Sequence, residues 1–339
     1  MADVKLNTLD RVPEALYTAR PEALEDLLGG PTLLHLPGRR PAPLFVSLLL
    51  HGNESTGLHA LQRVLQSFGA STLPRALSVF IGNVAAARFG LRRLDGQPDY
   101  NRIWPGSPVT GCDEAAVLAE VVAQMQSRDV FASIDVHNNT GLNPHYACVN
   151  RLETPFLHLA TLFARTVVYF TEPAGVQSAA FASLCPAVTV ECGKPDSPGS
   201  ATHAAEFISA ALHLAEFPRH PIAAHDLDLY HTVATVKIPD TVTLSFDGEP
   251  ADVMFVPELD HLNFRDLPAG TALAQVRDGH REPLWIPDAD GGNRWRDFLQ
   301  VRAGRLELTR ALMPSMLSRD ARVVRQDCLC YFMERLPLP

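Results

Sequence analysis

The sequence lacks any apolar run long enough to cross a membrane as a helix, which takes about 20 residues. Its first residues also lack the apolar core of a secretory signal peptide. The six cysteines are scattered through 339 residues, and Cys328 and Cys330 lie too close together for a zinc-ribbon knuckle. We therefore expect a cytoplasmic protein with reduced thiols, no disulfide framework and no membrane contact.

Clusters of basic residues are absent as well. The chain has 29 Lys and Arg against 38 Asp and Glu, which gives a net charge of −9. A surface of that sign repels polyanions, so we expect no nucleic-acid partner. Apolar residues make up 46% and charged residues 20%, the proportions of a globular protein, and 339 residues are enough for two domains.

One polar stretch, His51-Gly52-Asn53-Glu54, directly follows the unbroken apolar run 44–50. A short, bounded apolar run is typical of a buried strand in a parallel sheet, and open α/β sheets bind ligands at the carboxyl ends of their strands. An imidazole and a carboxylate are good zinc ligands, and Gly52 allows the tight turn that brings them together. The structural alternative is a strand-end histidine followed by a glutamate that favours a helix start.

Strands alternate with helices as far as about residue 220. This alternation predicts a three-layer α/β/α domain with a mostly parallel sheet at residues 1–220. Beyond it, short strand-like runs such as 272–276 and 323–333 are separated by Gly, Pro and Asp, which predicts a smaller β-rich domain at 221–339. Such strands leave edges that need cover, and homo-oligomerisation is one way to cover them.

Two further apolar runs end in a side chain of the same chemical type, one at His137 and one at Glu191. Because the carboxyl ends of parallel strands share one edge of the sheet, we expect both residues to lie near His51 and Glu54. The intervening segment 83–108 has no periodicity, and a long irregular loop inside a compact domain is usually functional. Together these features predict a metal site with an acid–base group beside it.

The sequence resembles the succinylglutamate desuccinylase/aspartoacylase family of the zinc carboxypeptidase clan. Four motifs carry the resemblance, in this order: His51-Gly-Asn-Glu54, Asp99-Tyr-Asn101-Arg102, Asp135-Val-His137-Asn138 and Glu191-Cys-Gly193. It covers about residues 44–195, and the β-rich tail is similar to the appended C-terminal domain of that family. The resemblance implies a zinc-carboxypeptidase-like fold and one Zn²⁺ ion held by His51, Glu54 and His137.

The chemistry of the remaining side chains, taken with the resemblance, suggests their roles. Glu191 would be the general base that takes a proton from water and passes it to the leaving amine, unless it only caps or forms a salt bridge. Arg102 suits a bidentate grip on a substrate carboxylate, assisted by Asn101, although an exposed ion pair is the simpler alternative. His145 is either a substrate contact or a loop residue that bonds to the backbone.

Two roles stay open at this stage. Asp135, two positions before His137, could accept the other ring N–H of that imidazole and fix its tautomer, or cap the following loop. Family members use a tyrosine as a proton donor, and both Tyr146 and Tyr230 are candidates here. The sequence does not choose between them.

The chain departs from the family pattern at two places. Leu94 occupies the position where the family has an arginine that stabilises the oxyanion, and we favour Arg93 over Arg92 and the more distant Arg88 for that role. Aspartoacylase and its close relatives also carry an arginine shortly before the catalytic glutamate, and this arginine binds an acidic side chain of the substrate. This chain has no Lys or Arg between residues 172 and 191, so N-acetylaspartate and N-succinylglutamate are poor candidate substrates.

These features predict a zinc-dependent hydrolase that cleaves an amide bond of a small carboxylate-bearing substrate, of the N-acyl amino acid deacylase type, with water activated by zinc and Glu191. One alternative is a metallocarboxypeptidase acting on short peptides, because the same ligands, base and arginine would serve it. Another is a zinc-binding protein without catalysis. The sequence does not identify the acyl group or distinguish amide from ester substrates.

Overall fold

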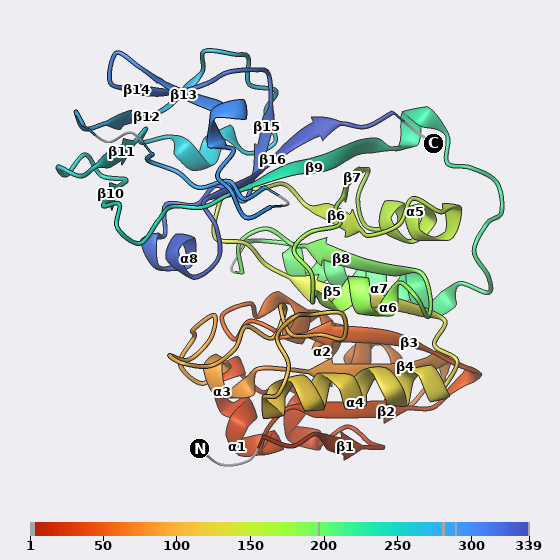
Figure 1. The fold of residues 1–339 in the computed structure, drawn as a ribbon. Helices are drawn as coiled ribbons and strands as arrows, with labels where there is room; N and C mark the ends of the chain where they lie inside the picture. The colour runs from red at the N-terminus through yellow and green to blue at the C-terminus, as the bar shows by residue number, and fades with distance from the viewer. Residues whose placement is uncertain (1–3, 196, 280–281, 289, 338–339) are drawn as a thin grey trace. The chain divides into compact units, whose positions relative to one another are not determined.

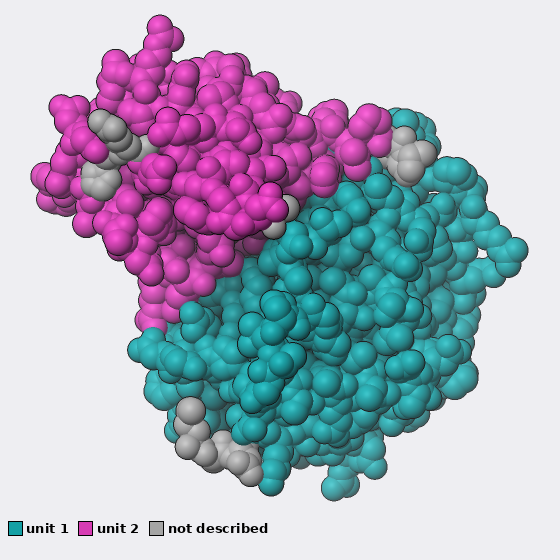
Figure 2. Space-filling view, in the orientation of Figure 1, with its two compact units in different colours: residues 1–138, 145–229, 338–339 teal, residues 139–144, 230–337 magenta. Residues whose placement is uncertain are grey.

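The computed structural model describes residues 4–195, 197–279, 282–288 and 290–337 (Figure 1). The chain forms two compact units, coloured separately in Figure 2. Unit 1 contains residues 1–138 and 145–229, and unit 2 contains residues 139–144 and 230–337. None of the described helices is both long enough and apolar enough to cross a membrane.

Unit 1 is built on a mostly parallel sheet. Its strands lie in the order β1, β2, β4, β3, β5, β8, β6 and β7. Antiparallel pairs occur between β2 and β4 and between β6 and β8, and the pairs β1–β2, β3–β4, β3–β5, β5–β8 and β6–β7 are parallel. The bounds in chain order are β1 (Asn7–Leu9), β2 (Thr32–Leu36), β3 (Gly38–Leu48), β4 (Leu73–Ile81), β5 (Ala132–His137), β6 (Tyr146–Val149), β7 (Thr166–Tyr169) and β8 (Ala187–Glu191).

Helices cover both faces of this sheet. Figure 1 shows α4 and α6 in front of the sheet, with α2 and α7 behind it. The helices of unit 1 are α1 (Leu24–Leu28), α2 (Thr56–Phe68), α3 (Val84–Ala87), α4 (Asp113–Ser127), α5 (Thr154–Thr161), α6 (Gln177–Phe181) and α7 (Ser200–His213), with short 3-10 turns at Glu14–Tyr17, Pro21–Ala23 and Ala224–Asp226. The predicted three-layer α/β/α architecture with a mostly parallel sheet is confirmed.

The alternation of side chains along β3 explains the two layers of helices. Phe45 stacks on Phe181 of α6, with ring centroids 4.4 Å apart and planes 9° from parallel. Leu48, three residues on, points to the opposite face because strand side chains alternate. There it meets α2 so closely that a Cβ on Gly57 would lie 2.7 Å from the Leu48 Cβ. An apolar strand buried on both faces therefore forms the centre of unit 1.

Unit 2 is rich in β-structure, as predicted. Most of β9 (Asp228–Val236) belongs to it and pairs antiparallel with β16 (Cys330–Arg335), which pairs with β15 (Met313–Ser315). A second sheet has the order β10, β11, β12, β14, β13, with bounds Leu244–Ser245, Val253–Phe255, Ala272–Val276, Arg305–Leu308 and Leu299–Arg302, and 3-10 turns lie at Leu259–Leu262 and Trp295–Asp297. Its core contains the buried aromatic residues Trp295, Phe298 and Phe332.

One predicted strand of unit 2 is wrong in its first half. The run 323–333 reads as a strand, but residues Ala321–Gln326 form helix α8 before β16 begins. The side chain of Asp320 accepts hydrogen bonds from the backbone N–H groups of Arg322 and Val323, which satisfies the free donors of a helix start. This local cap outweighs the β-branched residues that suggest a strand.

Candidate metal centre and active site

The turn after β3 places the first two candidate ligands. A Cβ on Gly52 would lie 2.2 Å from the backbone nitrogen of Ala87, so only glycine fits this approach of two backbones. The Gly52 N–H donates to the carbonyl of Arg92 at 3.1 Å, and the Glu54 N–H donates to that of His51 at 3.1 Å. The turn therefore brings His51 and Glu54 to the carboxyl end of β3, as predicted.

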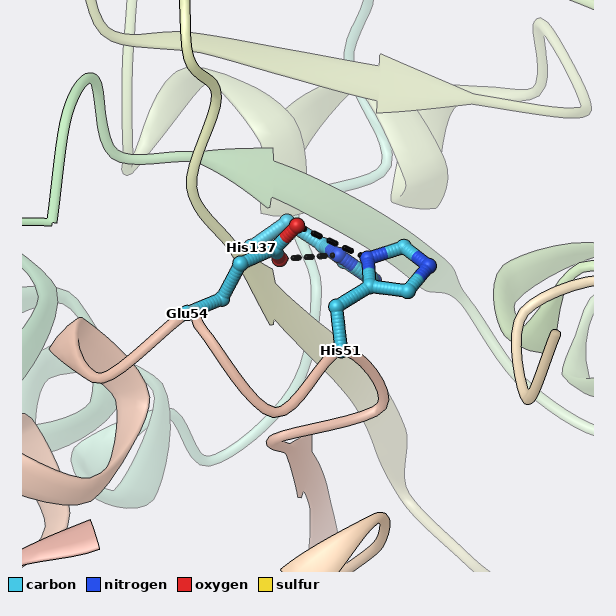
Figure 3. Close-up of side chains that lie close together, drawn as sticks. All are labelled: His51, Glu54 and His137. Atoms are coloured by element: carbon cyan, nitrogen blue, oxygen red, sulfur yellow. Dashed lines mark hydrogen bonds and ion pairs between the residues drawn. The ribbon is translucent and has the colours of Figure 1, made fainter. Parts of the chain in front are cut away.

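His137 ends the neighbouring parallel strand β5 and completes a compact group of three side chains (Figure 3). One ligand atom from each of His51, Glu54 and His137 lies within 4.8 Å of the others. The Nδ1 atoms of His51 and His137 are 2.8 and 2.7 Å from the two carboxylate oxygens of Glu54. All three residues are at most 6% exposed.

The outer nitrogen of each imidazole is held by a carboxylate. His51 Nε2 donates to Asp99 Oδ1 at 3.0 Å, and His137 Nε2 donates to Asp135 Oδ2 at 2.8 Å. Asp135 is fully buried and also accepts a hydrogen bond from Ser47 at 2.7 Å. Protons on both Nε2 atoms leave both Nδ1 atoms facing Glu54, which is how metal-bound histidines are usually oriented.

The electrostatics of the group are those of a cation site. Burial acts to raise the pKa of Glu54, but His51 and His137 outweigh it and hold that pKa well below its usual range. Burial likewise acts to lower the pKa of His137, yet Asp135 and Glu54 raise it well above its usual value. Three carboxylates and one guanidinium, that of Arg92, surround the two imidazoles. A divalent cation bound between the two imidazoles and Glu54 would be favoured by these surrounding carboxylates.

This donor set fits Zn²⁺. Two imidazole nitrogens and one glutamate are an established ligand set for catalytic zinc, and each imidazole already has the outer carboxylate that such sites use. Glu54 Oε2 also accepts the backbone N–H of Asn138 at 3.0 Å, which restricts its orientation. The described residues thus provide a buried, oriented set of three ligands on one turn and one strand end.

The irregular segment between α3 and α4 delivers Asp99 and its neighbours to this group. Trp104 anchors it, fully buried and edge-on to Phe80 and Phe181 at 5.8 and 6.0 Å. The backbone N–H of Trp104 donates to the Gly175 carbonyl at 3.0 Å. A fixed aromatic anchor holds the loop in one conformation, so its polar residues lie in defined positions beside the metal ligands.

Of the arginines in this loop, the structure places Arg92 beside the ligands. Its Nη2 donates to Asp99 Oδ2 at 2.9 Å, and its Nη1 lies 3.9 Å from Glu54 Oε1. Arg93, which the sequence favours, instead donates to the Gln97 carbonyl at 2.8 Å. Arg88 forms ion pairs with two acidic side chains of α1. Burial acts to raise the pKa of Asp99, but Arg92 and His51 keep it well below its usual range.

Asn101 and Arg102 lie next to the metal ligands. The Asn101 amide nitrogen is 3.2 Å from His137 Nε2, and its Oδ1 accepts the backbone N–H of Gln177 at 3.0 Å. Arg102 donates to the Asn101 carbonyl at 2.8 Å. The loop therefore brings both predicted substrate-binding residues to the same edge of the sheet as His137.

Glu191 ends β8, the strand next to β5. It pairs with His137 in the parallel register between the two strands and with Tyr146 across the antiparallel pair. Directly paired residues direct their side chains to the same face of a sheet, so Glu191 and His137 share a face. Glu191 is only 8% exposed. The chain thus places a largely buried carboxylate beside one metal ligand.

His145 contacts α7 and the backbone of Cys192. Its Nε2 is 3.1 Å from Ser200 Oγ, and its ring stacks on His203 with centroids 4.8 Å apart. Burial, followed by His203, lowers the pKa of His145. Ser200 is itself buried at the start of α7, so these contacts favour the structural alternative for this histidine.

Comparison with known proteins agrees with this geometry. Residues 44–217, just over half of the chain, match the family model of the succinylglutamate desuccinylase/aspartoacylase catalytic domain. The chain belongs to this family. Its members are hydrolases of the N-acyl amino acid deacylase type within the zinc carboxypeptidase-like clan. No curated protein matches the chain by sequence.

Several solved structures share the family fold at low sequence identity. The succinylglutamate desuccinylase of Chromobacterium violaceum has a TM-score of 0.56 and 20% identity, covering 88% of this chain and 86% of that one. Murine aminoacylase 3 has a TM-score of 0.59 and 15% identity, with coverages of 88% and 96%. The ectoine utilization protein EutE (DoeB) of Ruegeria pomeroyi has a TM-score of 0.54 and 15% identity, with coverages of 90% and 88%.

Two features of the site escape sequence reasoning. The hydrogen bond from His51 to Asp99 joins residues 48 positions apart, and the only sequence signal was the place of Asp99 two residues before Asn101. The position of Arg92 depends on the path of the same loop. The presence of Trp104 in this polar segment was the available sequence clue that the loop is fixed rather than free.

Proposed function

We propose that this family member is a zinc-dependent hydrolase that cleaves the amide bond of a small, carboxylate-bearing substrate of the N-acyl amino acid type. The observation that carries the proposal is the buried group of His51, Glu54 and His137 with a carboxylate behind each imidazole. A Zn²⁺ ion bound there would lower the pKa of a water molecule and polarise the scissile carbonyl.

Glu191 acts as the general base in this proposal. It takes the proton of the attacking water as the new C–O bond forms, and it then gives that proton to the amide nitrogen as the C–N bond breaks. The products are a carboxylic acid and an amine. The register that pairs Glu191 with His137 supports this assignment, as does the burial of Glu191, which keeps competing water away.

Arg92 is our candidate for stabilising the oxyanion, in place of Arg93. Its guanidinium lies beside Glu54, whereas that of Arg93 is directed to a backbone carbonyl. Fixed donors near the reacting carbonyl stabilise the negative charge that develops on its oxygen. Arg102, with Asn101, holds the substrate carboxylate, because a planar guanidinium can bind both carboxylate oxygens at once.

We further propose that the amino acid released carries a neutral side chain. The segment from residue 172 to residue 191 contains no Lys or Arg. Gln177 and Ser178, both fully buried there, bond to Ser133 and Thr189. Because this segment offers no cation to pair with a second carboxylate, an acidic side chain on the released amino acid would be disfavoured.

A second candidate function is a metallocarboxypeptidase acting on short peptides, since the same base and arginine would serve it. A panel of N-acetyl neutral amino acids, N-acetylaspartate, N-succinylglutamate and dipeptides separates the two. We expect turnover of the neutral N-acyl amino acids and at least a hundredfold lower activity on the acidic substrates. Faster cleavage of dipeptides would favour the peptidase.

Catalysis itself is tested with Glu191→Gln, which keeps the shape of the side chain and removes the base. We expect this variant to bind one equivalent of zinc and to lose turnover by at least a hundredfold. If the native chain binds one equivalent of zinc but turns over no amide or ester substrate, the protein is a metal-binding protein without catalysis.

We also propose that the protein is cytoplasmic, with its six free thiols reduced. We further propose that it forms a homo-oligomer, and a size-exclusion mass measurement tests this.

A further inference from the structure

A basic hollow lies at the opposite end of β3 from the metal ligands. It has a volume of about 530 Å³ and is lined by Arg39, Arg40, Phe68, Ser71, Thr72, Pro74 and His213, all within unit 1. β3 and β4 begin here in parallel, with Gly38 paired to Leu73. From Arg40 to Leu48 the strand extends roughly 25 Å at about 3.3 Å per residue, so the hollow is separate from the substrate site.

The cations at this hollow are not compensated by carboxylates. Within the part of the chain that the structure describes, neither the Arg39 nor the Arg40 side chain forms an ion pair or a hydrogen bond. Arg75 is paired in register with Arg40, and its guanidinium donates to the carbonyls of Ala42 and Leu214. Burial and then the neighbouring Arg40 lower the pKa of Arg75 to about 10. Like charges are thus held close together in a protein whose net charge is −9.

The other lining residues suit a particular kind of anion. Ser71 and Thr72 add two hydroxyl donors to the two guanidinium groups, which is more than a single carboxylate needs and matches the oxygens of a phosphoryl group. Phe68 and His213 stack on each other with ring centroids 6.0 Å apart, and both residues line the hollow. A volume of about 530 Å³ is that of a small-molecule site and exceeds what an inorganic phosphate ion would fill.

We propose that this hollow binds a phosphorylated small molecule. Its phosphoryl group contacts Arg39 and Arg40, which both line the hollow, and a flat portion of the ligand packs on the ring of Phe68. The guanidinium forks bind the phosphoryl oxygens in pairs, and the anion relieves the repulsion between Arg40 and Arg75. The hollow is then a second binding site, distinct from the one that takes the amide substrate.

Isothermal titration of the zinc-loaded full chain tests this proposal with four probes: inorganic phosphate, adenosine monophosphate, adenosine and succinate. We expect adenosine monophosphate to bind more tightly than phosphate, and adenosine and succinate to bind at least tenfold more weakly than adenosine monophosphate. The double variant Arg39→Gln/Arg40→Gln should weaken adenosine monophosphate at least tenfold. Arg63→Gln, an exposed arginine on α2 outside the hollow, is the matched control and should leave the Kd unchanged.

A third variant separates the two parts of the proposed ligand site. Phe68→Leu should weaken adenosine monophosphate and leave inorganic phosphate unaffected, because only the flat portion contacts the ring. Equal binding by the native chain and the double variant would overturn the proposal, since any phosphate bound at the zinc site would survive both substitutions. Succinate binding as tightly as adenosine monophosphate would show a carboxylate site and overturn the phosphoryl assignment.

Discussion

At the scale of single residues, the candidate metal centre depends on carboxylates that never touch the metal. Asp99 and Asp135 each accept the Nε2–H of one imidazole, and this leaves the inner nitrogens directed at Glu54. The sequence suggested Asp135 for such a role because it lies two positions before His137 on one strand. It did not suggest Asp99, because the contact depends on the path of a loop without periodicity.

Asp99→Asn should weaken zinc binding by about 10- to 100-fold, the usual loss when such an outer partner is removed. The asparagine keeps the shape but replaces the charged acceptor that orients His51. A chelator competition titration measures the zinc Kd, and Asp240→Asn, at an exposed position, is the control. An unchanged Kd for Asp99→Asn would show that Asp99 does not orient the ligand.

At the scale of elements, close packing between helix and strand positions the site. The turn that carries His51 and Glu54 is fixed between β3 and α2, and α2 can approach β3 only because residue 57 is glycine. The sequence predicted β3, α2 and β5 from their apolar patterns. It missed α8, because the β-branched residues after Asp320 suggest a strand and the cap that decides the matter is a single side chain.

Gly57→Ala should lower the free energy of unfolding by about 1–3 kcal/mol, the usual loss from overpacking a core. In an open helix the same change would raise it by up to about 1 kcal/mol. Here the new Cβ would lie 2.7 Å from Leu48 Cβ and 3.3 Å from Val136 Cβ, and neither atom is at the end of a flexible side chain. Urea denaturation measures the change, with the exposed Arg63→Ala as control. A more stable Gly57→Ala protein would contradict the packing described here.

A half-buried histidine connects β2, β4 and α4 and should make stability depend on pH. His35 Nδ1 accepts the hydroxyl of Ser78 at 2.8 Å, and its Nε2 donates to Gln124 at 3.2 Å. Burial lowers the pKa of His35 below its ordinary value of 6.5 despite that second bond. At a pH between the two values, the unfolded chain therefore binds a proton that the folded chain does not.

The free energy of unfolding should consequently fall as the pH drops below 6.5, and the fall should end once the pH is below the lowered pKa of His35. Part of this fall should be absent in His35→Gln, because glutamine can still form hydrogen bonds but does not bind a proton in this pH range. Denaturant midpoints between pH 7.5 and 5 measure the effect. His225→Gln, at a side chain that is 83% exposed, is the control. Identical pH profiles for the native chain and His35→Gln would refute the role of His35.

At the scale of the whole molecule, the sequence predicted an α/β unit followed by a β-rich unit, and the chain forms both. It did not predict that residues 139–144, soon after His137, belong to unit 2. Gly141 packs there against the backbone of Leu317, where a Cβ would lie 1.9 Å from the carbonyl oxygen. A contact between residues so far apart in the sequence leaves no periodic pattern in the sequence. A prediction from sequence patterns therefore assigns residues 139–144 to the same domain as the residues on either side of them.

Zinc should stabilise the whole fold, because a ligand that binds only the folded chain shifts the unfolding equilibrium. At free zinc about 1,000 times the Kd, the gain is roughly 4 kcal/mol. Thermal unfolding after EDTA treatment, with and without added zinc, should show a clear rise in Tm for the native chain. Glu54→Gln, which removes the central carboxylate, should show no response. Equal shifts in both proteins would place the stabilising zinc elsewhere.

Anomalous diffraction at the zinc edge, from crystals of the zinc-loaded protein, tests the proposed metal centre. We expect one strong peak within bonding distance of His51 Nδ1, His137 Nδ1 and the Glu54 carboxylate, with Glu191 beside it. We also expect the peak to be lost in Glu54→Gln. A peak at other residues, such as Cys328 and Cys330, or no peak in a protein with zinc in excess, would rule out this metal centre.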